Sequence, residues 1–318
     1  MEQENSNSQQ LINPQKEGTL AIDLGNSTTV VAFQGKRDSN VTLLDLPPIT
    51  RLKGEVPSLV WHCPDNPFNP LVGNEVSNLK DYEKNDLNLS SDFKRWICSP
   101  DKSTTSKSIL TPEEAGELLI LEIWKCIPKQ LIIKRLVLTA PVETYKEYRS
   151  WLVNVCSQLQ VNEIALVDEP TAAAMGAGLP PGSKLLVIDI GGSTIDFSLV
   201  ALEGGEGKAE PVAQLLRCHG QNLEGKSNQV LRCAKVLGKG GQRIGGRDID
   251  KWIANYLSPN EPMTESILNA AERLKCRLSE RDLKETKILI ENFTSQITQT
   301  SQELRLSKID LERLIKEK

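Results

Sequence analysis

Two stretches of the chain share one pattern of apolar and polar positions. In residues 186–199, Leu-Val-Ile-Asp-Ile-Gly-Gly-Ser-Thr-Ile-Asp-Phe-Ser-Leu, an apolar run stops at an acid and a glycine turn and then resumes. This pattern predicts a β-hairpin with Asp189 at its turn. Residues 20–33, Leu-Ala-Ile-Asp-Leu-Gly-Asn-Ser-Thr-Thr-Val-Val-Ala-Phe, align with it at one offset of 166 residues, the value of both 189 − 23 and 191 − 25. The chain is therefore expected to contain the same hairpin twice.

The residues of both turns suit a phosphate group. Glycines allow backbone N–H groups to approach an anion closely, and Ser and Thr hydroxyls add further donors. A single copy could equally be an ordinary glycine-containing hairpin, but two copies in register make coincidence a poor explanation. The predicted phosphate-binding residues are Gly25, Asn26, Ser27, Thr28, Gly191, Gly192, Ser193 and Thr194.

An acid precedes each turn, Asp23 in the first hairpin and Asp189 in the second. A carboxylate cannot bind phosphate directly. Magnesium keeps most of its own waters when it binds to protein carboxylates and phosphates. We therefore expect Asp23 and Asp189 to bind Mg²⁺ through water and to be part of a catalytic centre.

The hydrophobic pattern also predicts a series of α/β elements between the hairpins. Thr111 is expected to cap a helix that has Pro112 in its first turn. Residues 134–141 read as a buried strand that ends at a proline, and residues 144–159 as a helix. A further apolar strand ends at Asp168 and Glu169, before a proline and an alanine run that starts another helix.

Composition and charge exclude several classes of protein. The chain has 318 residues with 38 basic and 42 acidic side chains, a net charge of −4, and no basic block that would indicate nucleic acid or an anionic membrane as a partner. It has no apolar run of eighteen residues, so no spanning helix is expected. Seven scattered cysteines lack a C-x-x-C pair, which favours free thiols in a reducing cytoplasm over a zinc site or disulfides.

The paired hairpins resemble the phosphate-binding turns of the superfamily of actin, sugar kinases and heat-shock ATPases. A Walker-type site is excluded because the chain has no G-x-x-x-x-G-K-[ST] motif, and a dinucleotide fingerprint because a strand, not a helix, follows each turn. The resemblance implies an α/β, two-lobed actin-like ATPase fold with duplicated ribonuclease H-like lobes. It also implies that ATP or ADP binds with Mg²⁺ between the lobes.

Several segments resemble DnaK-type heat-shock chaperones in particular. Asp-Glu-Pro-Thr-Ala-Ala-Ala at residues 168–174 is similar to the family's Asn-Glu-Pro-Thr-Ala-Ala-Ala. Weaker similarities are Glu-Val-Pro-Ser-Leu-Val at 55–60, Phe-Lys-Arg-Trp-Ile-Cys at 93–98 and Ile-Gly-Gly-Arg-Asp-Ile-Asp at 244–250. The resemblance implies that Glu169 orients or deprotonates the attacking water, although an acid there could instead cap the following helix. It also implies that Pro141 and Arg149 relay the nucleotide state to another domain, although both could be ordinary structural residues.

The chain departs from the chaperone pattern at two positions. The family's Gly-x-x-Ala-Lys segment corresponds to residues 73–77, and Ser77 replaces the lysine that reaches the γ-phosphate. Lys80, one turn later, is more simply a solvated residue. Cys276 replaces an arginine that stacks on adenine, which is expected to weaken nucleotide binding. The positions that agree with the family's nucleotide contacts are Gly245, Gly246, Glu272, Lys275 and Ser279.

The resemblance also gives a domain organisation. Residues 1–17 are expected to be a disordered tail. Lobe I is predicted over 18–182, with its core at 18–50 and 107–182 and a peripheral insert at 51–106. Lobe II is predicted over 183–318, with its core at 183–244 and about 301–318 and an insert at 245–300. The last elements of the family's module are expected to be missing, which would leave lobe II incomplete at its C-terminal end.

Together these features predict an ATP-binding, chaperone-type ATPase module that controls protein folding or assembly and hydrolyses ATP slowly. The resemblance implies a cytoplasmic protein with nucleotide as its ligand and co-chaperones or client proteins as partners. Two alternatives stay open. One is a non-hydrolysing nucleotide-binding or scaffold relative, and the other is a sugar kinase or filament-forming relative.

Overall fold

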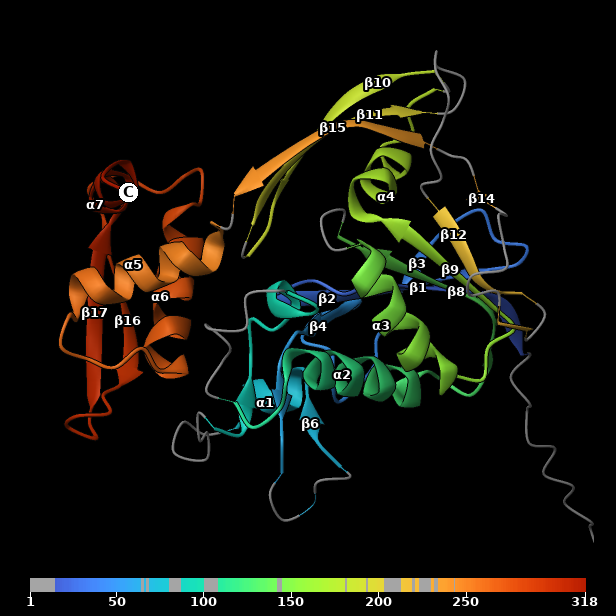
Figure 1. Ribbon diagram of the computed structural model, residues 1–318. Coiled ribbons are helices and arrows are strands. Elements are labelled where there is room, and N and C mark those ends of the chain that lie inside the picture. Colours follow the sequence, from blue (N-terminus) through green and yellow to red (C-terminus); the bar gives the residue numbers. More distant parts are fainter. Residues whose placement is uncertain are drawn as a thin grey trace, which may run out of the picture.

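The structure is a computed structural model (Figure 1). It describes residues 15–63, 66, 69–79, 87–99, 108–141, 145–180, 182–192, 194–202, 213–218, 221–222, 230–231, 234–242 and 244–318. Runs of strands are interspersed with helices along these residues, and the fold is mixed α/β with central sheets covered by helices. The α/β class and the actin-like architecture predicted from the sequence are confirmed.

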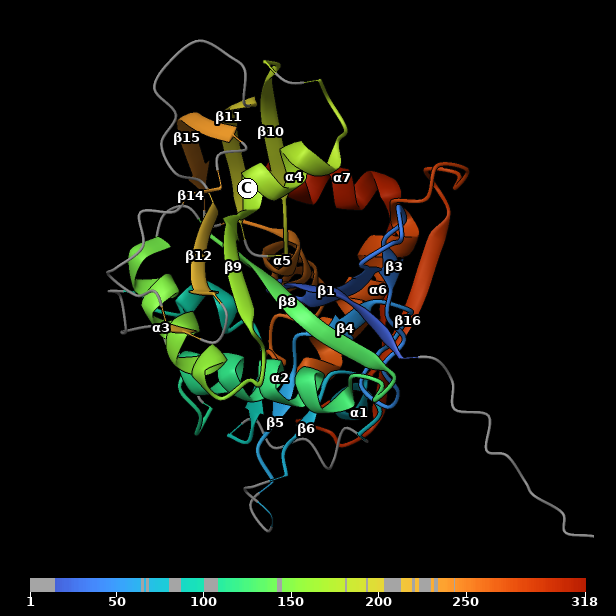
Figure 2. The ribbon, with the colours of Figure 1, turned by 90° about the vertical axis from the view of Figure 1, so that its right-hand side faces the viewer.

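The largest sheet of the described residues has nine strands. Its main order is β13-β12-β9-β8-β1-β2-β3, with β4 also on β2 and β14 also on β12. β1 runs antiparallel to β2 and parallel to β8, and β8 runs parallel to β9 (Figure 2). The bounds are β1 Lys16–Asp23, β2 Thr28–Gly35, β3 Thr42–Leu43, β4 Glu55–Pro57, β8 Leu131–Ala140, β9 Glu163–Asp168, β12 Ala213–Cys218, β13 Gln221–Asn222 and β14 Val230–Leu231.

Two helices, α2 (Pro112–Cys126) and α3 (Tyr145–Ser157), lie on one face of this sheet (Figure 1). The apolar stripe of α2, which includes Leu119 and Ile123, is buried in the same hydrophobic cluster as the apolar face of β1 and β2. The predicted start of α2 is confirmed by a capping box, because Thr111 Oγ1 accepts a hydrogen bond from the Glu114 amide at 3.2 Å while the Glu114 carboxylate accepts one from the Thr111 amide at 2.8 Å.

The second predicted hairpin consists of β10 (Lys184–Ile190) and β11 (Ile195–Leu202), and β15 (Ala234–Gln242) completes a three-stranded sheet. Asp189 lies one residue before the end of β10, so it precedes the turn and is not part of it. The two hairpins have the same register, since Asp23 pairs with Val30 and Asp189 pairs with Asp196, each shifted by 166. α4 (Glu169–Gly176) packs on one face of this sheet.

Smaller elements surround these two sheets. On the side of the first sheet they are β5 Val60–Trp61, β6 Leu71–Val72, α1 Asn74–Ser77, β7 Leu89–Ser90 and the 3-10 helix Lys94–Trp96. After β15 the elements are α5 Gly246–Leu257, α6 Glu265–Leu278, β16 Ile288–Thr294, β17 Ser301–Ser307 and α7 Lys308–Lys316. The latter group has its own hydrophobic cluster.

The boundaries of the two lobes stay a proposal, and two pairings differ from what those boundaries imply. β12, inside the predicted lobe II core 183–244, pairs with β9 of the first sheet. β17 and α7, inside the predicted core 301–318, share a hydrophobic cluster with α5 and α6 of the predicted insert. The physical reason is that β17 pairs with β16 along its full length, so its apolar side chains pack where those of β16 do.

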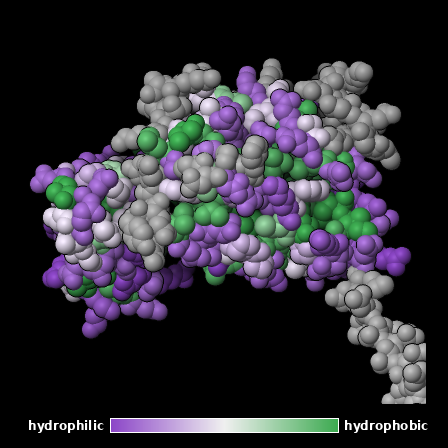
Figure 3. All heavy atoms as spheres, turned by 90° about the horizontal axis from the view of Figure 1, so that it is seen from below, coloured by the Kyte–Doolittle hydropathy of each residue, from purple (hydrophilic) through white to green (hydrophobic). Residues whose placement is uncertain are grey.

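Seen from below, hydrophilic side chains surround scattered apolar patches (Figure 3). Within the described ranges no helix is long and apolar enough to cross a lipid bilayer. The five cysteines whose side chains the structure describes, Cys63, Cys98, Cys126, Cys156 and Cys276, are free thiols. Residues 1–14 of the predicted tail lie outside the described residues.

Candidate functional site

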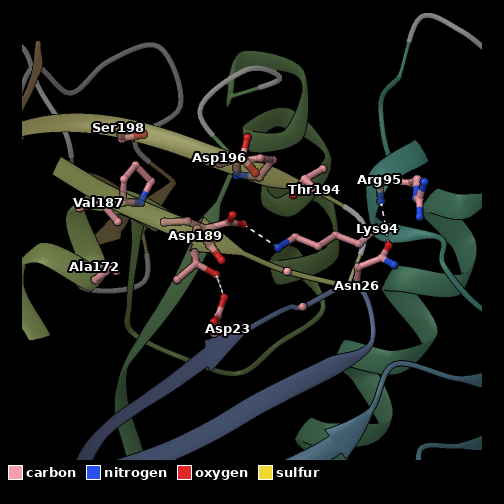
Figure 4. Close-up of a pocket in the computed structure, with 18 of the residues that line it drawn as sticks. Asp23, Asn26, Lys94, Arg95, Ala172, Val187, Asp189, Thr194, Asp196 and Ser198 are labelled. Atoms are coloured by element: carbon pink, nitrogen blue, oxygen red, sulfur yellow. Dashed lines mark hydrogen bonds and ion pairs between the residues drawn. The ribbon is translucent and has the colours of Figure 1, made fainter. Parts of the chain in front are cut away.

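A cavity of about 720 Å³ lies between the two hairpins. It is lined by both glycine turns, by the 3-10 helix Lys94–Trp96, by the end of β8 and by the start of α4 (Figure 4). Ten of the predicted catalytic and phosphate-binding residues line it, namely Asp23, Gly25, Asn26, Ser27, Thr28, Glu169, Asp189, Gly191, Gly192 and Thr194. Ser193 lies outside the described residues. Side chains 166 residues apart thus meet in one hollow.

The first turn is held in place by Ser58, at the end of the segment Glu-Val-Pro-Ser. The Ser58 hydroxyl donates to the Gly25 carbonyl at 2.7 Å, and the Ser58 amide donates to the Ser27 carbonyl at 2.9 Å. Ser58 is 1% exposed, so these bonds are shielded from water. Because the Gly25 and Ser27 carbonyls accept hydrogen bonds from Ser58, the turn can direct its hydrogen-bond donors toward the cavity.

The second turn is braced in a similar way by the segment Ile-Gly-Gly-Arg. The Gly246 amide donates to the Gly191 carbonyl at 3.1 Å, and the Arg247 amide donates to the Gly192 carbonyl at 2.7 Å. The Gly191 amide is itself bonded to the Thr194 carbonyl at 2.9 Å. Gly245 and Gly246 were predicted to contact nucleotide, but neither lines the cavity. Gly246 supports the turn, and the Gly245 amide donates to the Asp248 carboxylate at 2.9 Å at the start of α5.

The two turns touch each other. A Cβ added to Gly192 would collide with the Ser27 hydroxyl and lie 3.2 Å from Ser27 Cβ. Only a residue without a side chain permits this approach. The close contact puts backbone groups of both hairpins around one small space, as expected for a cradle that encloses an anion.

Several charged residues line the cavity, and Lys94 lies among three of its acids, Glu169, Asp23 and Asp189. Lys94 Nζ lies 2.7 Å from Glu169 Oε1, and Figure 4 shows the lysine extending toward the carboxylates. Burial lowers the pKa of Lys94, but Glu169, Asp23 and Asp189 outweigh burial and the pKa is raised. Burial raises the pKa of Glu169, and the Lys94 ammonium partly counteracts this effect. Lys94 is thus a cation fixed among acids.

The carboxylates Asp23 and Asp189 are suited to a hydrated metal ion. Asp23 accepts a hydrogen bond from the Thr139 hydroxyl at 2.6 Å, which orients the carboxylate. Burial raises the pKa of Asp189, with Lys94 acting in the opposite direction. In the described part of the chain no group of three or more His, Cys, Asp or Glu side chains is arranged to bind a metal directly. Two carboxylates on one cavity fit Mg²⁺ that keeps its waters, as magnesium commonly does.

The two acids at the end of β9 have different roles. Asp168, which is buried, caps α4 by accepting a hydrogen bond from the Thr171 amide at 2.9 Å. Glu169 makes no cap and points to Lys94 instead. The alternative that one of these acids caps the helix therefore applies to Asp168. Glu169 lines the cavity instead.

The predicted adenosine residues on α6 do not line the cavity. Lys275 donates to the Gly246 carbonyl at 2.9 Å and lies 2.7 Å from the buried Asp250 carboxylate, so its described contacts are internal. Ser279 donates to the Lys275 carbonyl at 2.8 Å. Glu272 and the exposed Cys276 also lie outside the cavity lining.

The predicted switch residues are separated in the same way. Pro141 lines the cavity, whereas Arg149, on α3, does not. Their relay role stays a proposal.

That Ser77 leaves the site without the phosphate-binding lysine of the chaperones stays a prediction. Ser77 is at the end of α1, where its hydroxyl points to the Gly73 carbonyl at 3.5 Å, and it does not line the cavity. Lys80 lies outside the described residues. A cation that does lie beside the acids of the site is Lys94, which belongs to the segment 93–98 quoted from the sequence but was not assigned a role. Its signal was present: a Lys-Arg pair directly follows an apolar residue in a segment that resembles the chaperones.

Comparison with known proteins agrees with this geometry. A family model described as MreB/Mbl protein matches residues 110–214. Chaperone protein DnaK of Ureaplasma parvum is 26% identical over 94% of this chain and 51% of its own length, and that of Thermosipho melanesiensis is 27% identical over 84% and 42%. Heat shock 70 kDa protein 13 of Rattus norvegicus is 33% identical, but over 30% of this chain and 21% of its own length.

The chain thus spans about half the length of the curated relatives it matches. The matches to the DnaK proteins cover most of this chain at low identity. The fold, the cavity between the paired hairpins and these matches together support an actin-like ATPase fold of the kind found in the nucleotide-binding domain of DnaK-type chaperones.

Proposed function

We propose that the chain binds ATP and ADP with Mg²⁺ in the cavity between the hairpins and hydrolyses ATP slowly. The observation that carries the proposal is the meeting of the two turns, with Gly192 against Ser27, beside Asp23, Asp189, Glu169 and Lys94. A cavity of about 720 Å³ has room for a nucleotide.

The proposed roles follow from the chemistry of each group. Backbone N–H groups and hydroxyls of the turns donate to the phosphate oxygens. Asp23 and Asp189 orient waters of Mg²⁺, which when bound neutralises charge on the β- and γ-phosphates. Lys94 supplies a further positive charge toward the transferred phosphoryl group, where charge must be stabilised.

Glu169 is the proposed group that orients the attacking water and takes its proton. Burial raises its pKa toward the range in which a carboxylate is a useful base, and Lys94 keeps the ionised form accessible. A nucleotide phosphate that attracts Lys94 would loosen the 2.7 Å ion pair and free the carboxylate. Binding and activation of the base would then be linked.

The test is isothermal titration calorimetry with magnesium-ATP on the wild-type chain and on Asp23→Asn. Saturable binding that weakens at least tenfold, about 1.4 kcal/mol, in the variant is expected because the metal loses one of its carboxylates. Glu303→Gln is the control, since Glu303 is an exposed acid on β17 outside the cavity and its replacement should leave the affinity unchanged. Absence of heat with wild-type protein at millimolar nucleotide would contradict the proposal.

A second candidate is a nucleotide-binding scaffold that does not hydrolyse ATP. It is favoured by the observation that the α6 residues Glu272, Lys275 and Ser279 do not line the cavity, which leaves the nucleoside with fewer contacts. Phosphate release distinguishes the two candidates. Equal, background-level release by wild type and Glu169→Ala, with ATP binding intact, would favour the scaffold.

The similarity to DnaK-type chaperones motivates a role in protein folding or assembly, with co-chaperones or client proteins as partners, in the cytoplasm. The match to the MreB/Mbl model raises a filament-forming relative as a further outcome. Sedimentation with and without ATP separates these possibilities, because nucleotide-driven polymers would favour the filament.

A further inference from the structure

Tyr148 has a buried hydroxyl that makes no hydrogen bond to any residue that the structure describes. The side chain belongs to the large hydrophobic cluster and is 1% exposed. Buried hydroxyls in folded proteins are nearly always paired, because an unpaired one loses its hydrogen bonds to water and gains nothing in return. An exception needs an explanation, and one explanation is a partner that the hydroxyl gains in another state of the protein.

The fold places Tyr148 at the same end of the sheet as the proposed base Glu169. β8 and β9 are parallel, and at their C-terminal ends Ala140 pairs with Asp168, the residue before Glu169. α3 connects these two strands, so it begins at that end of the sheet. Tyr148 is in the first turn of α3 and therefore lies at the level of Glu169.

Packing contacts place Tyr148 behind the wall of the cavity. Its ring makes an edge contact with the Trp151 ring, with centroids 5.0 Å apart. A Cβ added to Gly116 would lie 2.8 Å from Trp151 Cζ2 and 2.9 Å from Ile97 Cδ1, so Trp151 and Ile97 meet at that glycine. Ile97 lines the cavity, whereas Tyr148 does not. The Tyr148 ring thus belongs to the layer of side chains behind the lining.

The charges around Tyr148 agree with this placement. Burial raises the pKa of Tyr148 well above its ordinary value, and the carboxylates of Glu169 and Asp23 act in the same direction. The hydroxyl therefore stays protonated at neutral pH and is available as a donor. Hydrogen bonds from a hydroxyl to a carboxylate are shorter and stronger than those between neutral groups.

Under the proposed function, Glu169 loses its cation when nucleotide binds. In the structure its Oε1 is 2.7 Å from Lys94 Nζ, and both side chains are mostly buried. A phosphate that attracts Lys94 removes this cation, while Asp23 and Asp189 still disfavour the ionised Glu169. A poorly solvated carboxylate without a partner is costly. Glu169 then lacks a partner at a place where Tyr148 also lacks one.

We propose that Tyr148 is a positioning residue for Glu169: when Lys94 turns to the phosphates, the Tyr148 hydroxyl donates to the Glu169 carboxylate and holds it toward the attacking water. A buried donor and a buried acceptor then each gain a partner. The nucleotide-dependent step rests on the proposed function, but the pairing of Tyr148 with Glu169 can be tested in the protein without nucleotide.

The first test replaces Lys94, so that Glu169 is uncovered without nucleotide. Urea unfolding is measured for Tyr148→Phe in wild type and in Lys94→Met. In wild type the substitution should leave the folding equilibrium constant unchanged or increase it, because it removes a hydroxyl that has no partner among the described residues. In Lys94→Met it should decrease the constant about tenfold, because the hydroxyl there donates to Glu169.

Equal effects of Tyr148→Phe in wild type and in Lys94→Met would overturn the proposal. The difference between the two backgrounds should disappear when Glu169→Ala is added to both, since the hydroxyl then has no carboxylate to donate to. A difference that survives Glu169→Ala would show that Tyr148 pairs with another group, and the proposal would again be wrong.

The second test uses nucleotide and leaves Lys94 in place. Calorimetry with magnesium-ATP should give an affinity about tenfold lower for Tyr148→Phe than for wild type, since only the bound state contains the new hydrogen bond. Tyr256→Phe is the matched control, because Tyr256 is exposed on α5 and does not line the cavity. Unchanged affinity in Tyr148→Phe would overturn the proposal. Absence of binding by wild type would instead contradict the proposed function, and urea unfolding would still decide the pairing.

The pH profile of phosphate release separates positioning from a purely structural role. The profile of kcat/KM reports the free protein, and that of kcat reports the nucleotide complex. A hydrogen bond from Tyr148 favours the ionised form of Glu169 in the complex alone. In Tyr148→Phe the fall of kcat at acid pH should therefore begin at a higher pH, while the fall of kcat/KM stays in place.

The charged groups that act on Glu169 or line the same cavity are not altered by Tyr148→Phe. They are Lys94, Asp23, Asp189, Arg95, Asp196 and Lys239. A shift of kcat without a shift of kcat/KM would thus be due to the Tyr148 hydroxyl. Profiles of Tyr148→Phe that overlay those of wild type would show that this hydroxyl does not position Glu169.

Discussion

Gly192 packs against Ser27, and both residues line the cavity. Ser27 belongs to the first glycine turn and Gly192 to the second, and equivalent residues of the two turns are 166 positions apart in the sequence. The contact brings the backbones of two separate hairpins close enough to surround one anion. Gly192 also receives support from the Arg247 amide, which donates to its carbonyl at 2.7 Å. The cradle therefore depends on the absence of a side chain at position 192.

Gly192→Ala is expected to weaken binding of magnesium-ATP about tenfold or more, because the added methyl group would push Ser27 out of the cradle. Calorimetry gives the affinity, and thermal melting reports stability. Gly176→Ala is the matched control, since a Cβ there meets nothing within 4 Å. Unchanged affinity in Gly192→Ala would separate this contact from phosphate binding.

Lys94→Met is expected to change the pH dependence of phosphate release. Burial raises the pKa of Glu169 and Lys94 opposes this effect, so removal of the ammonium raises the pKa further. Glu169 accepts a proton only when ionised, so the rate falls as pH decreases through its pKa. In Lys94→Met this fall should begin at a higher pH, and the rate at neutral pH should drop about a hundredfold.

Lys251→Met is the control for charge alone, because Lys251 lies 3.9 Å from Asp92 and does not line the cavity. A pH profile in Lys94→Met that overlays the wild-type profile would show that the ion pair does not set the ionisation of Glu169.

The raised pKa of Asp250 leads us to expect that the free energy of unfolding depends on pH. Burial raises the pKa of this carboxyl from 3.8 to about 6, although Lys275 lies 2.7 Å away and lowers it. A carboxyl whose folded pKa is above its unfolded value favours folding in its protonated form. The stabilisation that protonated Asp250 gives the folded state is fully present below about pH 4, near its unfolded pKa, and is lost as pH rises through its folded pKa of about 6. Its size is on the order of 1–3 kcal/mol.

The measurement is urea unfolding of wild type and Asp250→Asn between pH 4 and 8. The free energy of unfolding of wild type minus that of the variant should decrease as pH rises through this window and level off above it. A difference that increases with pH would contradict the raised pKa.

Glu265 connects elements on the two sides of the cavity. The Arg247 guanidinium donates to both Glu265 oxygens at 2.5 and 2.7 Å, and the Ser91 hydroxyl donates to Glu265 Oε1 at 3.1 Å. Arg247 and Glu265 are largely buried, so loss of one partner leaves a poorly solvated charge. The contact of Ser91 with Glu265 must break if α6 moves away from the loop that contains Ser91.

Glu265→Gln is therefore expected to speed release of a fluorescent ADP analogue about three- to tenfold, because breaking an interaction worth about 1 kcal/mol changes a rate by this factor. Stopped-flow displacement by excess ATP measures the rate. Glu303→Gln, which removes the exposed pair with Arg305, is the control. A release rate equal to wild type would show that the contacts among Ser91, Arg247 and Glu265 do not restrict opening.

Sequence alone determined the features that depend on local chemistry and on the repeat. The paired register of the hairpins, the capping box at Thr111 and the strand end that delivers Glu169 all follow from patterns of a few residues, and the structure agrees. The composition of the two turns was also sufficient to predict that they would share one cavity.

Tertiary structure alone decided which distant side chains meet. Lys94 approaches Glu169, and Ser58 supports the first turn, through packing of segments that are far apart in the chain, which no local pattern encodes. The place of Ser77 at the end of α1, outside the lining of the cavity, is likewise set by the fold. Residue propensity and hydrophobic periodicity act over one turn of a helix or a pair of strands. A site is assembled by packing of segments that are far apart in the sequence. For that reason only the folded chain shows which residues line the site.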